Sequence, residues 1–259
     1  MGMLPLFKSD FSIGKSILTL NHPDKSLDGG SDSIFEIAQS NGLKEVILVE
    51  NCLTGFLQAI KNSEDLGIQL IFGLSLIVCN DLSQEPKANS RQDESNIIVF
   101  AKNGSGCKLL NKIYSKAFTE GYGRIDYKNL KKIWEPDVFL YIPFYDSFIF
   151  KNAMGFNNCT PELSFTEPTF FIEENGLPFD SLIREKVLSY CEKNNLKTET
   201  AKSIYYKSRD DFAAYQTYKC ICNRKYGSAD FGLVNPKLEH CGSKEFSFES
   251  WKEKNDEIS

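Results

Sequence analysis

Residues 45–56 read EVILVENCLTGF, an apolar run that ends abruptly in polar residues. The run 46–49 predicts a strand that is buried on both faces, as in a parallel sheet. Glu50, Asn51 and Cys52 follow it directly and precede a turn with glycine. The carboxyl ends of buried strands are where α/β proteins usually hold their functional groups. The stretch therefore predicts an α/β fold with a candidate site at this strand end.

The same alternation of apolar strand and helical segment continues along the chain. Glycines follow two helical segments, at Gly42 and Gly67, where they favour helix termination. The expected strands are 4–7, 46–49, 68–78, 96–102, 138–142, 169–173 and 196–200, and the expected helices are 31–41, 56–66, 108–118, 182–194 and 210–222. This pattern predicts a parallel α/β sheet or barrel. We expect one domain over 1–259, with an ordered core of about 4–250 and a charged, frayed tail from Trp251.

Composition limits the classes of function. The 259 residues include 30 Lys plus Arg against 35 Asp plus Glu, a net charge of −5 that argues against an autonomous DNA-binding module. With only two histidines, His22 and His240, the chain cannot build a site from several imidazoles. No apolar run approaches the roughly 18 residues of a membrane span, and the start does not resemble a signal peptide. The eight cysteines are too sparse for a disulfide scaffold, so we expect a cytoplasmic protein with reduced thiols.

Several segments resemble one known family when they are read in order. They are SDFSI (9–13), VILVENCLTGFLQAI (46–60), LGIQLIFGLSLIV (66–78), NIIVFAKNGSGCKLLNKIYSKAFTEG (96–121), TFFIEENGLP (169–178) and RDDFAAYQTYKCI (209–221). In order and spacing they are similar to the polymerase and histidinol phosphatase (PHP) domain at the N-terminus of the bacterial DNA polymerase III alpha subunit. The most specific piece is 101–121. The resemblance implies a distorted seven-stranded βα barrel, which is a TIM-like barrel.

The resemblance also identifies the positions at which active PHP enzymes hold Zn, Mn or Mg ions. Those enzymes use histidines and carboxylates at the strand ends, and the metals activate water for phosphoester hydrolysis. The matching positions of this chain form a vestigial PHP cleft: Leu6, Lys8, Glu50, Asn51, Ser75, Asn96, Phe144, Ser203 and Tyr205.

Most of these residues are unsuited to metal binding. Leu6 has no donor atom, and a protonated Lys8 repels cations. Glu50 alone keeps a strong ligand, and one carboxylate cannot hold a cluster of metals. We therefore expect no catalytic residues, no metal ligands and no cofactor. We also expect Lys8, Glu50, Asn51, Asn96 and Tyr205 to form a hydrogen-bonded polar plug.

The function implied is that of a catalytically degenerate domain with a structural or protein-docking role. The expected partners are the polymerase core domains, the proofreading exonuclease subunit, or both, with weak or indirect contact to nucleic acid and none to a membrane.

Three alternatives stay open at this stage. One is a metal-dependent phosphoesterase or nuclease with a rebuilt minimal site around Glu50, using Asp10 or Asp126. Another is an independent nucleic-acid binder, for which the outer row Lys108, Lys112 and Lys116 of one helix is the candidate face. The last is a zinc site at Cys220, Cys222, His240 and Cys241, although a C-x-C pair on a helix directs its sulfurs apart.

Overall fold

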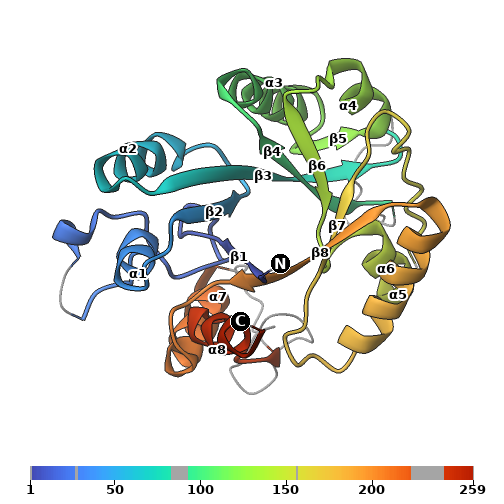
Figure 1. Ribbon diagram of the computed structural model, residues 1–259. Helices are drawn as coiled ribbons and strands as arrows, with labels where there is room; N and C mark the ends of the chain where they lie inside the picture. Colours follow the sequence, from blue (N-terminus) through green and yellow to red (C-terminus); the bar gives the residue numbers. More distant parts are fainter. Residues whose placement is uncertain (1, 27–28, 83–92, 156, 223–241, 259) are drawn as a thin grey trace. The chain divides into compact units, whose positions relative to one another are not determined.

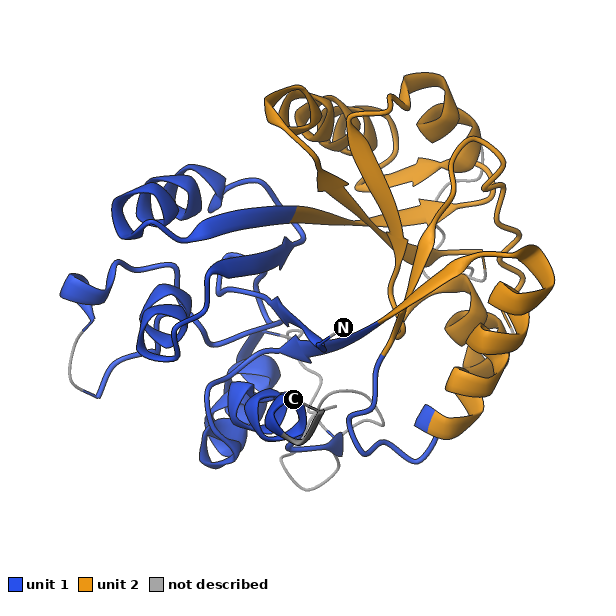
Figure 2. Cartoon of the chain, in the orientation of Figure 1, with its two compact units in different colours: residues 1–72, 173–180, 200–259 blue, residues 73–172, 181–199 orange. Residues whose placement is uncertain are grey.

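The computed structural model describes residues 2–26, 29–82, 93–155, 157–222 and 242–258. The chain divides into two compact units (Figure 2). Unit 1 comprises 1–72, 173–180 and 200–259, and unit 2 comprises 73–172 and 181–199. Each unit is described by itself below.

Unit 1 is built on three strands labelled in Figure 1: β1 (Leu4–Phe7), β2 (Glu45–Glu50) and β8 (Lys197–Ile204), the last shared with unit 2. β1 pairs in parallel with both others, with Leu6 opposite Ile47 on one side and Ser203 on the other. The expected strand 196–200 was too short, because β8 continues to Ile204. Ser203 is therefore in the strand and Tyr205 follows its carboxyl end.

The helices of unit 1 are α1 (Ile34–Ser40), α2 (Phe56–Leu66), α7 (Phe212–Cys222) and α8 (Phe248–Ile258), with short 3-10 turns η1 (Pro23–Lys25) and η2 (Arg209–Asp211). Local sequence explains two of their ends. The Ser33 side chain accepts the backbone N–H groups of Phe35 and Glu36 and so begins α1. Gly67 ends α2 in the left-handed region, at φ 64°, which glycine adopts without strain.

The expectation of a frayed tail from Trp251 was wrong. That residue lies inside α8, where its indole N–H donates to the carbonyl oxygen of Met3 at 2.8 Å. Phe248 stacks on Phe7 with ring centroids 6.0 Å apart. Two aromatic anchors are enough to fix a helix whose other residues are mostly charged, because tertiary packing supplies most helical stability.

Unit 2 contains most of β3 (Gln69–Cys79), together with β4 (Ser95–Ala101), β5 (Arg124–Asp126), β6 (Val138–Ile142) and β7 (Thr169–Ile172). Its helices are α3 (Gly104–Glu120), α4 (Tyr127–Ile133), α5 (Phe148–Gly155) and most of α6 (Asp180–Asn194). β4 runs antiparallel to both β3 and β6, whereas β3–β5 and β6–β7 are parallel pairs. The expectation of an all-parallel sheet was therefore wrong for β4. It is the next strand after β3 and pairs beside it as in a hairpin.

The strands follow the order β2-β1-β8-β7-β6-β4-β3-β5, and β2 also pairs with β3. This second pairing closes seven strands into a ring and leaves β5 outside it. The chain is thus an α/β barrel of seven strands, as predicted, with mixed strand direction. Among the described residues, no helix has the length and apolar character needed to cross a membrane.

Side-chain alternation along β1 positions the candidate site. Phe7 is fully buried and faces α8. Leu6 lies on the opposite face of the strand, with Ser203 beside it. Two of the positions identified by the family resemblance are therefore neighbours on the face that α8 does not cover.

Candidate functional site

Glu50, the last residue of β2, is a fully buried carboxylate. Its Oε1 accepts the backbone N–H of Ser9 at 2.8 Å, and its Oε2 accepts the Ser12 hydroxyl. Burial raises the pKa of Glu50, while the charge of Lys8 and the hydrogen bonds from the two serines oppose that rise. Both carboxylate oxygens are thus engaged by protein donors.

The loop after β1 supplies those donors by folding back over the strand ends. Within it, Ser12 N–H donates to the Ser9 carbonyl at 3.1 Å, and Lys15 N–H donates to the Ser12 carbonyl at 2.9 Å. Gly14 has φ 72°, a conformation that favours glycine. The Ser12 hydroxyl also accepts the backbone N–H of Asn51 at 2.9 Å, so one serine joins the loop to the end of β2.

Lys8 follows β1 and is only partly exposed. Its Nζ donates to Asn51 Oδ1 at 3.0 Å. Burial lowers the pKa of Lys8 to about 8; attraction to Glu50 partly offsets this effect and repulsion from Lys15 adds to it. We call Lys8, Ser9, Ser12, Glu50 and Asn51 the strand-end cluster.

The strand-end cluster differs from the expected plug in three ways. Glu50 bonds to Ser9 and Ser12 rather than to Lys8. Tyr205 belongs to an aromatic stack, with its ring centroid 5.4 Å from Phe246. The fifth expected member, Asn96, lies in unit 2. The sequence did indicate that Ser9 and Ser12 lie near the end of the first strand, because the segment 9–13 follows that strand closely. It did not indicate that they donate to Glu50, because the conformation of a short loop cannot be derived from its sequence alone.

Ser203 bonds to a second buried carboxylate, which the sequence reasoning did not select. The Ser203 backbone N–H and hydroxyl donate to Glu173 at 2.8 and 2.9 Å, and Asn175 donates to it at 3.0 Å. Burial raises the pKa of Glu173, against these hydrogen bonds. Glu173 directly follows β7, and its position at a strand end in the segment TFFIEEN was the available signal.

The remaining cleft residues lie in unit 2. Ser75 is opposite Ile98 in the β3–β4 pair, and Asn96 is opposite Ile77. Ser75 and Asn96 are therefore diagonal neighbours on one face of that pair. Phe144 is fully buried. A hydroxyl, an amide and a phenyl ring do not form a strong metal site.

The residues at these strand ends do not fit a cluster of metal ions. Leu6 has no donor, Lys8 carries an ammonium group, and the oxygens of Glu50 are already engaged. In the part of the chain that the structure describes, no three His, Cys, Asp or Glu side chains lie close enough together to hold a metal.

The alternative ligands are placed elsewhere. Asp126 caps α4 by accepting the Asn129 backbone N–H at 2.7 Å, and Asp10 is exposed. Cys220 and Cys222 lie in α7 as free thiols, and the rest of the proposed zinc site, His240 and Cys241, is outside the described residues.

The lysine row of α3 is partly neutralised. Lys116 pairs with Glu120 at 2.6 Å, and Lys112 lies 3.8 Å from Glu135. Such exposed pairs contribute little to stability. They also reduce the positive charge that a nucleic-acid interface would need.

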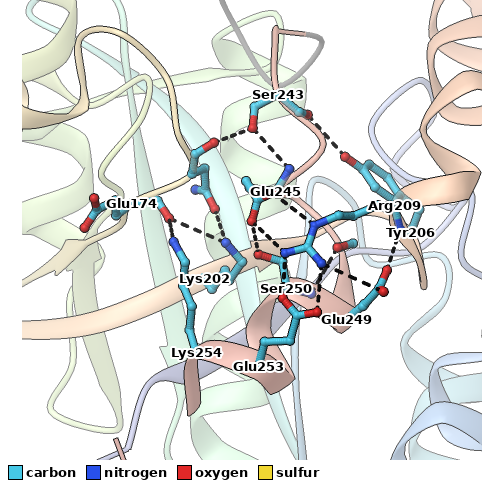
Figure 3. Close-up of polar contacts among 12 residues, drawn as sticks. Glu174, Lys202, Tyr206, Arg209, Ser243, Glu245, Glu249, Ser250, Glu253 and Lys254 are labelled. Atoms are coloured by element: carbon cyan, nitrogen blue, oxygen red, sulfur yellow. Dashed lines mark hydrogen bonds and ion pairs between the residues drawn. The ribbon is translucent and has the colours of Figure 1, made fainter. Parts of the chain in front are cut away.

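A second polar network of unit 1 joins η2 to α8 (Figure 3). Arg209 donates to both oxygens of Glu245, at 3.0 and 3.2 Å, and to both oxygens of Glu253, at 2.9 and 2.7 Å. Its backbone N–H donates to Glu249 at 2.8 Å. We call these four residues the α8 clamp. Partial burial alone would raise the pKa of Glu245, but hydrogen bonds from Arg209 and Ser250 lower it to about 2.

Lys202 lies beside the α8 clamp and is fully buried (Figure 3). Its Nζ donates to Asn175 Oδ1 at 2.7 Å and to the Glu174 carbonyl at 3.5 Å, and that carbonyl also accepts Lys254 at 3.0 Å. Burial lowers the pKa of Lys202 to about 8, and repulsion from Lys254 contributes to the same shift. The only feature of the sequence that pointed to Lys202 was the presence of a lysine within a strand.

No family model and no curated protein matches the sequence. Among solved structures, the chain is similar to a two-domain protein from Bacteroides vulgatus ATCC 8482 that contains a predicted PHP-like metal-dependent phosphoesterase, with 12% identity and a TM-score of 0.38. The match covers 76% of this chain and 50% of that one, so the chain spans about half the length of that structure. Because the sequence identity and the TM-score are this low, the function is argued below from the residues of this chain alone.

Proposed function

We propose that this chain is a catalytically degenerate PHP-like domain with a structural or protein-docking role. It would belong to, or be related to, the alpha subunit of a bacterial replicative DNA polymerase III. Its partners would be the polymerase core domains, the proofreading exonuclease subunit, or both. It would need no metal cofactor and would act in the cytoplasm.

The observation that carries the proposal is the bonding of the strand-end cluster. A centre that activates water needs carboxylate or imidazole lone pairs directed at the metal, and an open position for the water. Here the oxygens of Glu50 accept from Ser9 and Ser12, and an ammonium group occupies the end of β1. Both features favour a hydrogen-bonded scaffold over a metal centre.

Exposed apolar side chains support a docking role. In unit 1, Ile13 is 77% exposed, Leu57 78% and Ile221 65%. Gly14, next to Ile13, lies against Cys222, next to Ile221, so these two isoleucines belong to neighbouring segments. Exposed apolar groups that cluster are typical of protein–protein interfaces.

Metal content is the first test. The purified chain is incubated with Mn²⁺ and Zn²⁺, desalted and analysed by mass spectrometry for bound metal. We expect no stoichiometric metal. Two or more Mn or Zn ions per chain would contradict the proposal.

Phosphatase activity separates this proposal from its main alternative, a phosphoesterase with a rebuilt site around Glu50. A buried strand-end carboxylate with a raised pKa is the feature that favours the alternative. We expect no Mn-dependent turnover of a phosphomonoester. Turnover that Glu50→Gln abolishes and Glu173→Gln preserves would establish the alternative, because both variants neutralise a buried strand-end carboxylate.

Docking is tested with purified polymerase core and purified exonuclease subunit from the same organism. We expect at least one of them to bind the chain, and Ile13→Glu to weaken that binding. Leu182→Glu, an equally polar change at an exposed leucine of unit 2, serves as the control. If neither protein binds, the docking role is wrong.

A further inference from the structure

The sequence contains three Asn-Gly pairs, at 41–42, 103–104 and 175–176. Such pairs are chemically labile, because the backbone nitrogen of the glycine can attack the preceding side-chain amide and glycine has no side chain to hinder the approach. The folded structure decides where the attack occurs, through access of water, freedom of the backbone and the groups bonded to the amide oxygen. One of the three pairs combines exposure with a cationic donor on that oxygen.

That pair lies at the end of α1. Asn41 and Gly42 are both exposed. The side-chain Oδ1 of Asn41 accepts a hydrogen bond from the ammonium group of Lys252, in α8, at 2.9 Å. Its Nδ2 donates to the Ile37 carbonyl at 2.8 Å. The Asn41 amide is thus held at the surface of unit 1 by a cation on its oxygen and a carbonyl on its nitrogen.

The backbone at this helix end has the freedom that the reaction needs. Asn41 has ψ 8°, so ring closure requires rotation about its Cα–C bond to bring the next nitrogen onto the side-chain carbon. The Gly42 N–H makes only a long hydrogen bond, 3.2 Å, to the Gln39 carbonyl, and a Cβ at Gly42 would meet no other group within 4 Å. Exposed helix ends open locally at little cost, because few buried contacts hold them.

Lys252 favours the reaction electrostatically. Negative charge develops on Oδ1 of Asn41 as the glycine nitrogen adds to the amide carbon. A donor already aimed at such an oxygen stabilises the transition state, and an ionised donor does so more strongly than a neutral one. The ammonium group therefore activates the amide that it bonds.

The other two Asn-Gly pairs each lack one of these features. Asn103 is exposed, but its Oδ1 accepts from a neutral donor, the backbone N–H of Gly106. Asn175 has an ammonium donor, Lys202, at 2.7 Å, but it is fully buried, where water and backbone movement are restricted. The chain therefore contains its own controls for exposure and for the cation.

We propose that Asn41 is a site of spontaneous deamidation that Lys252 activates. The backbone nitrogen of Gly42 forms a bond to Cγ of Asn41 and loses its proton to water; the bond from Cγ to Nδ2 breaks, and that nitrogen takes up a proton and leaves as ammonia. Water then opens the cyclic imide to give aspartate or isoaspartate. The net reaction consumes one molecule of water and releases one of ammonia, without oxidation, metal or cofactor, and it is independent of the proposed docking role.

The modification would change how α1 and α8 are joined. A carboxylate at position 41 forms an ion pair with Lys252 in place of the present hydrogen bond and loses the Nδ2 donor to the Ile37 carbonyl. Isoaspartate also inserts a methylene group into the backbone at the end of α1. Because no enzyme is needed, the modified fraction increases with the age of the folded chain.

The test is incubation of the folded full chain at mildly alkaline pH, with peptide mass spectrometry to follow each asparagine. We expect Asn41 to react roughly threefold or more faster than Asn103, a fraction of what such a donor contributes in a water-excluded site, and Asn175 to stay unmodified. In urea the three sites should react at similar rates, because their tertiary surroundings are lost. Equal rates at Asn41 and Asn103 in the folded chain, or the same ranking in urea, would overturn the proposal.

Two substitutions of Lys252 separate activation from restraint. Lys252→Met should slow the reaction at Asn41 by roughly threefold or more, whereas Lys252→Arg, which keeps a cationic donor, should preserve most of the rate. Asn103 is the internal control and should be unaffected by either variant, and an unmodified Asn175 shows that each variant is folded. If Lys252 only restrains the amide, Lys252→Met speeds the reaction instead; that result, or an unchanged rate, would overturn the proposal.

Discussion

Lys8 and Lys202 are two lysines whose pKa burial lowers to the same value, about 8, in very different surroundings. Lys202 is fully buried, and its ammonium bonds Asn175 and the Glu174 carbonyl beside the α8 clamp. Lys8 is partly exposed, and within the described part of the chain its ammonium group has one acceptor, Asn51 Oδ1. The same shift in pKa therefore accompanies two described acceptors at Lys202, beside the α8 clamp, and one at Lys8. We call the first arrangement the closed network and the second the open network.

The difference concerns how much each lysine contributes to the stability of the fold. A buried polar network in which every member is bonded holds its elements in one arrangement. A network with fewer hydrogen bonds contributes less to the fold. The pKa does not distinguish the two lysines, because it is about 8 for both. The number of hydrogen-bond acceptors around each ammonium group does distinguish them.

The largest effect is expected from breaking the closed network at Arg209. Arg209→Met leaves Glu245 and Glu253 without their shared cation and removes four side-chain hydrogen bonds. We expect a loss of about 2–4 kcal/mol in the free energy of unfolding, measured in urea. Lys112→Met, which removes an exposed pair, should change it by less than about 0.5 kcal/mol. Equal effects would show that the α8 clamp behaves as an ordinary surface contact.

Acid should weaken the closed network through Glu245. Its pKa in the folded chain is about 2, below its ordinary value of 4.5. A lowered carboxylate pKa stabilises the fold above the ordinary value, and that contribution is lost as the pH falls from about 4.5 towards 2. We expect Glu245→Gln to cost about 1–3 kcal/mol at neutral pH and progressively less across this window. A cost that is constant with pH would contradict the assigned bonding with Arg209.

Much of the fold follows from local pattern. The apolar run 46–49 lies within β2, and Gly67 ends α2 as expected. The helix expected from residue 31 begins only at Ile34, because Ser33 rather than Ser31 caps it. The direction of β4 was not predictable in this way, because it depends on which strands become neighbours. α8 was missed for a related reason: its two aromatic anchors act only when β1 and the N-terminal backbone are present to receive them.

The candidate site shows the same division. Lys8, Glu50 and Asn51 could be selected from the sequence because they lie at or directly after the end of an apolar run. Their partners were not, since Ser9 and Glu50 are 41 positions apart and Arg209 and Glu245 are 36 positions apart. Hydrogen bonds over such separations are set by the fold, and a single sequence contains no direct record of them.

Replacing each lysine by methionine compares the two networks directly. Lys202→Met removes the donor to Asn175 and to the Glu174 carbonyl inside a fully buried site, so we expect a loss of about 1–3 kcal/mol. Lys8→Met removes an ammonium group with one acceptor and keeps the aliphatic stem, so we expect a change of less than about 1 kcal/mol. Urea unfolding at neutral pH measures both. A larger loss for Lys8→Met would reverse the assignment of open and closed networks.

Alkaline pH compares the two lysines without substituting other residues, because it titrates both of them in place. A lysine whose folded pKa is about 8 and whose ordinary pKa is 10.5 binds fewer protons in the folded chain between these values. Stability therefore rises with pH in this window, by at most about 1.4 kcal/mol per pH unit for each lysine. The cost of Lys202→Met should grow from pH 8 to 10. That of Lys8→Met should grow in the same way, because burial lowers the pKa of both lysines to about 8. Urea unfolding at pH 8, 9 and 10 measures both profiles, and a cost that stays constant over this range would contradict the lowered pKa of that lysine.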